Sequence, residues 1–273
     1  MNNSMTIGFS RYANAFGGSL SLEDVRQRAP AVFAQSAHER TSGSYRFIPT
    51  ERVLTGLMQA GFVPVEARQT RAKYSAAHAR HMVRLRRRFE TVHLKDSVPE
   101  VVFLNSHDGT SSYQLRLGLF RAVCTNGLIV SVGAFPAYCV AHRGDIVDEV
   151  VTLALEASER FETLAGRVER MEQRLLAQDE QLGFARKALA LRFPELDKAG
   201  MQPSQLLGCR RVDDSSNNLW TVFNRVQENL LGGGLIRHTE SGRLSRTRRI
   251  TSIREDVRLN GRLWDLAEEV LAG

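Results

Sequence analysis

The chain lacks any apolar run that could span a bilayer, since no stretch approaches the roughly 20 apolar residues that a membrane-crossing helix needs. Its first residues also lack a basic stretch followed by an apolar one, so we expect no secretory signal. Cysteine is scarce: Cys124, Cys139 and Cys209 form neither a CxxC pair nor an even framework, which is typical of a reducing compartment. The sequence therefore predicts a cytoplasmic protein that does not bind a membrane.

Motifs of nucleotide and hydrolase chemistry are absent as well. The sequence contains no GxxxxGKS/T loop, no GxGxxG and no GxSxG. An enzyme built around His107, Asp108 and Cys124 is one alternative, although the Asp-Gly pair is typical of a turn and a thiol in an apolar strand is usually inert. A zinc site from Cys124, Cys139 and His142 would match no familiar spacing. A binding protein is favoured over an enzyme, and we expect neither cofactor nor metal.

Positive charge is what the chain has in excess. Lysine and arginine number 37 against 30 acidic residues, which gives a net charge of +7 and a pI near 9.8. Such a field attracts polyanions, of which nucleic acid is the commonest and an anionic membrane surface the second candidate. Arginine dominates over lysine, and its planar fork suits phosphate oxygens and guanine edges.

The excess lies in two segments. Residues 68–93 carry eight basic residues against one acid, and residues 235–262 carry eight against three. Each segment could be a solvent-exposed face whose basic residues pair with acids elsewhere in the chain. In residues 68–93, however, eight basic residues against one acid exceed what pairing within the segment could neutralise. His78 and His81 lie three residues apart on an expected helix of the first segment, where their side chains suit phosphate contact. We predict nucleic-acid contacts from both segments and, in second rank, from turns of the sheet: Arg71, Lys73, Arg80, His81, Arg84, Arg86, Arg87, Arg88, Asn105, His107, Arg116, Arg121, Asn126, Arg243, Arg246, Arg248 and Arg249.

The apolar pattern predicts an α+β fold. Alternating apolar residues and two tight-turn pairs indicate a short antiparallel sheet over about residues 98–142. A heptad stripe over about residues 145–182 predicts one long amphipathic helix that packs on the sheet, or alternatively forms a coiled coil between subunits. N-terminal helices flank the sheet, with Ser21 opening a capping box and Thr50 acting as an N-cap. C-terminal helices are predicted over residues 217–231 and from Ser252 onward.

Three segments are predicted along the chain. Residues 1–44 form an N-terminal arm with a short helix, and residues 45–192 form the α+β core. Residues 193–273 form a helical C-terminal region that contains a basic loop.

Several strings of the sequence resemble a known family. They are residues 45–50 (YRFIPT), 61–64 (GFVP), 80–86 (RHMVRLR), 105–109 (NSHDG), 120–128 (FRAVCTNGL) and 259–264 (LNGRLW). Together they resemble the phage/plasmid-like proteins, a bacterial domain-of-unknown-function family carried on prophages and plasmids, from about Tyr45 to Trp264. The resemblance implies a mobile-element setting and supplies no catalytic residues.

A second resemblance is architectural. Helices, an antiparallel sheet and a long helix, with basic segments beside them, are similar to the core of single-strand annealing recombinases. That likeness implies a ring-forming protein that holds single-stranded DNA in a basic groove without nucleotide hydrolysis.

These observations favour a nucleic-acid-binding protein of a mobile genetic element. We expect DNA, with the single strand favoured, in recombination or repair, and a homo-oligomer. The alternative is an anti-defence or regulatory factor without catalytic activity, which would bind a host protein through the acidic heptad helix.

Overall fold

A computed structural model describes most of the chain, in residues 18–71, 75–88, 97–121, 128–130, 138–140, 146–194, 200–239 and 242–273. The chain forms two compact units, residues 1–162 (unit 1) and 163–273 (unit 2). The sequence predicted three segments, with boundaries after residues 44 and 192. That division into segments stays a prediction. None of the described helices is long and apolar enough to cross a membrane.

Unit 1 is built on an antiparallel sheet of six strands. Its order is β1-β2-β3-β4-β5, and β6 also pairs with β4. The strands are β1 (Phe62–Gln69), β2 (His81–Arg87), β3 (Ser97–Asn105), β4 (Tyr113–Arg121), β5 (Leu128–Val130) and β6 (Tyr138–Val140). Strand β1 lies at an edge of the sheet. Proline is tolerated at such an edge because it has no N–H to donate to a neighbouring strand, which accounts for Pro64 in β1.

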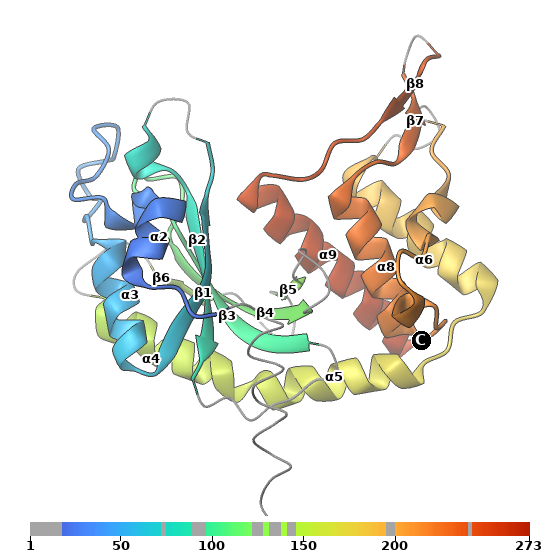
Figure 1. Cartoon of the computed structure of the whole chain (residues 1–273), viewed down its shortest axis with the longest axis horizontal. Coiled ribbons are helices and arrows are strands. Elements are labelled where there is room, and N and C mark those ends of the chain that lie inside the picture. The colour runs from blue at the N-terminus through green and yellow to red at the C-terminus, as the bar shows by residue number, and fades with distance from the viewer. Residues whose placement is uncertain are drawn as a thin grey trace, which may run out of the picture. The chain divides into compact units, whose positions relative to one another are not determined.

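Helices of unit 1 pack on the sheet, as Figure 1 shows. They are α2 (Leu22–Arg28) with the short η1 (Pro30–Phe33), α3 (Thr50–Gln59) and α4 (Val147–Glu159); η2 (Ala76–His78) lies in the β1–β2 connection. Helices α2 and α3 contact β1, and α4 contacts β3 and β4. The predicted α+β class is thus confirmed.

The strand registers divide the sheet into two unlike faces. One face carries Val83, Leu85, Val101, Phe103, Leu115 and Leu117, all buried. Arg87 shares this face and donates to Ser158 of α4, so this is the face that the helices cover. Successive side chains alternate across a strand, so the opposite face, called the outer face here, carries Glu66, Arg84, Arg86, Glu100, Gln114 and Arg116. The buried side chains of Met82, Val102 and Leu104 lie on this face as well.

The sheet begins earlier in the chain than the sequence indicated. The first basic segment, expected to be partly helical, contributes β1 and β2, and His81 opens β2 while His78 lies in η2. Val83 and Leu85 alternate with Arg84 and Arg86, which is the period of a strand that is apolar on one face.

The long helix expected over residues 145–182 is divided. Helix α4 ends at Glu159, α5 (Phe161–Gln173) follows after Arg160, and α6 begins at Gln178. Residues 174–177 leave the helix because their backbone bonds the segment before α8: Leu176 N–H donates to Asn217 O over 2.9 Å, and Leu219 N–H donates to Arg174 O over 2.8 Å. Most of the heptad stripe is buried, from Val150 in α4 to Met171 in α5, while Leu175 is 67% exposed.

Unit 2 is a helical bundle around one buried helix. Helix α8 (Leu219–Gly232) packs against α6 (Gln178–Arg192), η3 (Pro203–Leu207) and α9 (Ile253–Ala272). Phe223 of α8 stacks on Trp220 at 5.6 Å between ring centroids and meets Trp264 of α9 edge-on at 6.2 Å. Asn218 caps α8 and Ser252 caps α9, each accepting a backbone N–H of the first turn.

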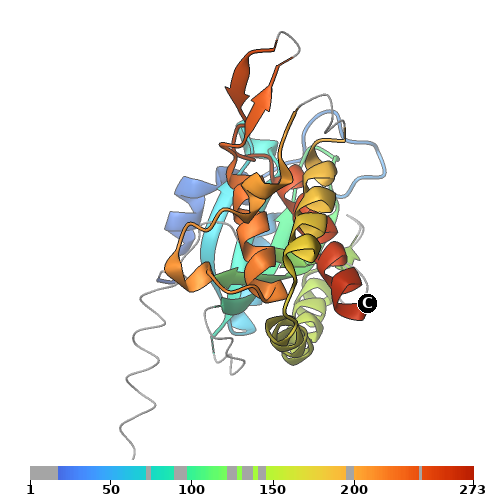
Figure 2. The same ribbon diagram turned by 90° about the vertical axis from the view of Figure 1, so that its right-hand side faces the viewer.

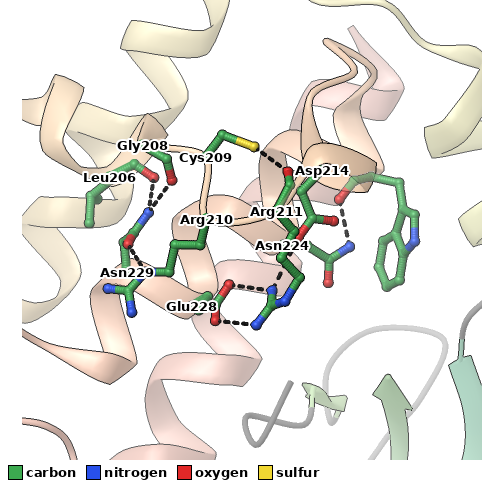
Figure 3. A network of polar contacts seen from close by, with 10 residues as sticks. Leu206, Gly208, Cys209, Arg210, Arg211, Asp214, Asn224, Glu228 and Asn229 are labelled. Carbon is green, nitrogen blue, oxygen red and sulfur yellow. Dashed lines mark hydrogen bonds and ion pairs between the residues drawn. The ribbon is translucent and has the colours of Figure 1, made fainter. Parts of the chain in front are cut away.

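Polar contacts fix the loop after η3 onto α8 (Figure 3). Asn229 donates to the carbonyl groups of Leu206 and Gly208 at 3.0 and 2.8 Å. Arg211, beside the short η4 (Val212–Asp214), forms a two-pronged ion pair with Glu228, both bonds 2.7 Å long. Charge-assisted pairs of this geometry hold both partners in one orientation, so η3 has a fixed place on α8.

Candidate nucleic-acid interface

Two of the predicted phosphate contacts, Arg84 and Arg86, are bound to carboxylates on the outer face of the sheet. Arg84 Nε donates to Glu100 Oε2 at 2.7 Å and Arg86 Nη2 to Glu100 Oε1 at 2.8 Å. Arg84 also pairs with Glu66, and its guanidinium lies 3.4 Å from the centroid of the Phe120 ring. Glu100 is fully buried, so these arginines neutralise a carboxylate that would otherwise be costly to bury.

Acids just outside the first basic segment therefore balance part of its charge. Glu66 comes from β1 and Glu100 from β3, on either side of β2. The count of eight bases to one acid missed them because it covered residues 68–93 only, and Glu66 and Glu100 lie just before and just after that range.

Other arginines of the first segment are more accessible. Arg71, Arg87 and Arg88 are exposed. Arg80 donates to Thr110 O at 3.0 Å, and Arg116 donates to Gln114 on its own strand at 2.9 Å. Among the predicted contacts, Lys73, Asn126 and the side chain of Arg121 lie outside the described residues.

His81, Asn105 and His107 meet in a buried polar cluster around Thr50, at the first turn of α3. The Thr50 hydroxyl lies 3.0 Å from His81 Nε2 and 2.9 Å from His107 Nε2, and it accepts from Asn105 Nδ2 at 2.9 Å. All four residues have no exposed surface. The structure therefore brings His81, Asn105 and His107 together, as three of the predicted nucleic-acid contacts. Their burial inside unit 1 prevents contact with a nucleic acid bound at the surface.

The hydrogen-bond directions in this cluster follow from one backbone carbonyl. His81 Nδ1 lies 2.9 Å from Ala79 O, which can only accept, so Nδ1 carries the proton. In a neutral His81 ring, Nε2 then accepts the Thr50 proton. A hydroxyl has one proton to give, so His107 Nε2 must donate to Thr50 Oγ1.

Two ionisable side chains near the cluster, Tyr113 and Asp108, are also held by hydrogen bonds. Burial raises the pKa of the Tyr113 hydroxyl, which donates to Ile48 O at 2.5 Å. Burial alone would raise the pKa of Asp108, but hydrogen bonds from Thr110 and Ser106 lower it overall. Asp108 is thus bound to Ser106 and Thr110, and His107 is bound to Thr50. Cys124, the third residue of the alternative enzyme site, lies outside the described residues. No cluster of metal-ligating side chains occurs in the part of the chain that the structure describes.

Three of the strings that carry the family resemblance converge at this cluster. Thr50 comes from residues 45–50, His81 from residues 80–86, and both Asn105 and His107 from residues 105–109. Buried, mutually bonded polar groups specify one arrangement of a core. We therefore assign these residues of the three strings a structural role in the core of unit 1.

The second basic segment forms a protruding hairpin in unit 2. Strands β7 (Ile236–His238) and β8 (Leu244–Arg246) pair antiparallel. Figures 1 and 2 show this ribbon standing away from the helices of unit 2. We call residues 234–249 the basic hairpin; its exposed arginines are Arg237, Arg243, Arg246, Arg248 and Arg249.

Neutral oxygens of the hairpin itself accept hydrogen bonds from two of these arginines. Arg237 Nε donates to Ser245 Oγ at 3.2 Å, and Arg246 Nη1 donates to Gly234 O at 3.2 Å. Within the described residues, no ion pair joins Arg237, Arg243 or Arg246 to a carboxylate. Unlike Arg84 and Arg86, they keep their charge available to an incoming anion.

The hairpin is anchored at its base through polar contacts. Gln205 of η3 bonds both backbone groups of Ile236, accepting from its N–H at 2.7 Å and donating to its carbonyl at 3.0 Å. Because the loop after η3 is fixed on α8, Gln205 gives the hairpin a defined root. Thr247 adds a backbone pair with Leu235 at 2.9 Å.

Arg192, at the end of α6, lies beside this root. Its guanidinium donates to Leu230 O and Arg248 O. Burial lowers the pKa of Arg192, and nearby Arg237 lowers it further while Glu255 opposes the change. The effect of Glu255 exceeds that of Arg237, so a carboxylate already balances part of the positive charge at this root.

The hairpin thus gathers four predicted residues, Arg243, Arg246, Arg248 and Arg249. Sequence reasoning missed Arg192, Arg237 and Gln205 as parts of the site. Arg237 belongs to the same charged run and could have been included, whereas no local signal marks Arg192 or Gln205.

Comparison with known proteins finds a family and close relatives. The sequence model of the family described as Domain of unknown function (DUF932) matches residues 37–264. UPF0380 protein YafZ and UPF0380 protein YfjQ, both from Escherichia coli, are each 40% identical to this chain over 272 residues. Each alignment covers 96% of this chain and 98% of the relative. No solved structure matches the chain.

Proposed function

The chain belongs to the DUF932 family, which confirms the expected family of unknown function, and we propose that it binds nucleic acid through the basic hairpin. The observation that carries this proposal is the set of five exposed arginines on one protruding ribbon. Neutralising phosphates with such side chains releases condensed counterions, which is the main source of affinity for proteins that do not read sequence.

The form of the hairpin supports the proposal. A two-stranded ribbon is narrow enough to enter a major groove or follow a single strand, and its side chains point to both sides. Arg237 lies on one face of the ribbon and Arg246 on the other, as their pairing with Ser245 and Ile236 requires. Phosphates on either side of the ribbon can therefore be contacted.

Accessible arginines of unit 1 form a second rank. Arg71, Arg87 and Arg88 are exposed, whereas Arg84 and Arg86 have low exposure and bind Glu100. We assign the first three a supporting contact with phosphates and the latter two a structural role.

The biological setting is part of the same proposal. The family resemblance favours a mobile-element setting, and the likeness to annealing recombinases favours DNA, a homo-oligomer and a role in recombination or repair. Both likenesses come from the sequence, and the exposed arginines of the hairpin are compatible with them.

Reversal of charge at the hairpin tests the proposal. A variant with Arg243→Glu and Arg246→Glu should bind a labelled oligonucleotide about tenfold more weakly, or worse, at low salt. A control with Arg170→Glu and Arg186→Glu, both exposed on helices of unit 2, makes the same change of net charge away from the hairpin. Anisotropy that falls equally for both variants would contradict a site at the hairpin.

A further inference from the structure

The basic hairpin exposes two large apolar side chains on one face. The register pairs Ile236 with Arg246 and His238 with Leu244, and residues two apart on a strand share a face. Ile236, His238, Leu244 and Arg246 therefore lie together. Ile236 is 42% exposed and Leu244 is 69% exposed.

Polar and backbone groups make the contacts described above at the base of the hairpin. The ribbon is anchored by the backbone bonds of Ile236 to Gln205 and of Thr247 to Leu235. Leu244 lies at the opposite end of β8 from Arg246, which pairs with Ile236 at that root. Exposed apolar side chains that do not serve the fold are typical of contact surfaces.

We propose that Ile236 and Leu244 pack against the faces of unpaired bases, so that the hairpin selects single-stranded nucleic acid or an opened duplex end. This inference rests on the proposed function, because the arginines must first bring the strand to the ribbon. It adds the side chains that distinguish strandedness.

Arginine contacts alone would not favour a single strand. Duplex DNA has a higher density of phosphates than single-stranded DNA. Each phosphate contact also makes the binding constant depend more steeply on salt for a duplex than for a single strand. In a duplex, however, the faces of the bases are stacked on one another and closed to side chains. Leucine and isoleucine reach them only where bases are unstacked, as in proteins that insert apolar wedges between base steps.

Charge argues for a nucleic acid over a second copy of this chain. The exposed apolar pair is flanked by Arg243 and Arg246, so two identical faces in contact would bring like charges together, which is unfavourable. An anionic polymer with apolar rings matches both the charge and the apolar character of the face.

The test is a variant with Ile236→Ser and Leu244→Ser. Its affinity for labelled oligothymidylate should fall about tenfold, while its affinity for a duplex of the same length stays within about twofold, because the arginines are retained. In addition, wild-type protein should raise the fluorescence of 2-aminopurine placed in the single strand, as that base unstacks, and the variant should not. The swapped pair Ile236→Leu and Leu244→Ile, which keeps apolar volume, should restore both signals.

The outcomes separate the two proposals. Failure of the wild-type protein to bind either strand at about 50 mM salt, where phosphate contacts are strong, would overturn the proposed function. Equal binding of both strands by wild type and by the serine variant would overturn this inference and leave the proposed function standing. Loss of dimerisation or of binding to anionic vesicles by the serine variant, with unchanged oligonucleotide binding, would assign the face to those partners instead.

Discussion

At Thr50 a single hydroxyl serves two imidazole rings and one amide in a site closed to solvent. Thr50→Val keeps the shape of the side chain and removes that hydroxyl. His81, Asn105 and His107 would each lose a hydrogen-bond partner, and every unsatisfied buried group costs roughly 1–3 kcal/mol. We expect the free energy of unfolding to fall by about 3 kcal/mol or more, measured by urea denaturation.

Thr55→Val is the matched control in the same helix. Among the described residues, the Thr55 hydroxyl bonds Glu51 O alone, at 2.9 Å and on a part-buried face. Its loss should cost about 1 kcal/mol or less. Equal losses for the two variants would show that the Thr50 cluster adds nothing to stability beyond one ordinary hydrogen bond.

Glu100 provides a second test at the scale of a residue. Glu100→Gln would leave Arg84 and Arg86 without their buried negative partner, and breaking such a pair costs about 3–5 kcal/mol. Glu66→Gln removes a carboxylate that is 34% exposed, and we expect a loss of about 1 kcal/mol or less because solvent screens the exposed pair. Thermal melting of both variants beside wild type measures the difference. A Glu100 variant as stable as wild type would contradict the structural role given to Arg84 and Arg86.

Among the elements, those with strong local signals could be predicted. The capping box at Ser21 opens α2, with Asp24 bonding the Ser21 backbone at 2.8 Å. Helices α8 and α9 begin after Asn218 and Ser252, and each of these residues caps its helix. Capping depends on residues three apart in sequence, which is why the sequence shows it. Thr50 is the exception: its hydroxyl is bound in the buried cluster, and Pro49 occupies the position before α3.

Elements that depend on distant contacts could not be predicted. Strand β2 is rich in arginine because Glu66 and Glu100, on its two neighbours, neutralise the outer face. The break between α5 and α6 contains neither glycine nor proline, and it exists because residues 174–176 bond the chain at Asn217 and Leu219. Backbone bonds to residues more than forty positions away leave no local pattern.

Gly233 determines how the basic hairpin leaves α8. Its φ is +73°, and a Cβ there would lie 2.6 Å from the carbonyl carbon of Arg248. Gly233→Ala should destabilise unit 2 by about 2 kcal/mol or more, since a left-handed residue with a side chain is strained and the obstacle is backbone. Gly232→Ala, where a Cβ meets nothing within 4 Å, should be neutral or stabilising by up to about 1 kcal/mol. Calorimetry of the two variants separates them, and two equal melting temperatures would contradict this role of Gly233.

At the scale of the whole molecule, the number of basic residues is a poor guide to the charge that a ligand meets. The two basic segments carry eight bases each. In the first, Arg84 and Arg86 bind Glu100, and His81 is buried. In the second, Arg237, Arg243 and Arg246 stand on a ribbon and bond no carboxylate among the described residues. Sequence showed where the charge was concentrated, and only the fold shows which part of it is already neutralised.

Nucleic-acid binding by the basic hairpin is tested most directly by the salt dependence of single-strand binding, measured by anisotropy between about 50 and 300 mM salt. Each phosphate contact contributes roughly −0.7 to the slope of log K against log salt on a single strand, so five hairpin arginines predict a slope of about −3 to −4. Changing Arg243 and Arg246 to Glu should make that slope shallower by at least about 1.4, while the Arg170 and Arg186 control keeps it. A steep slope that is the same in wild type, control and hairpin variant would contradict the account and place the phosphate contacts elsewhere on the protein.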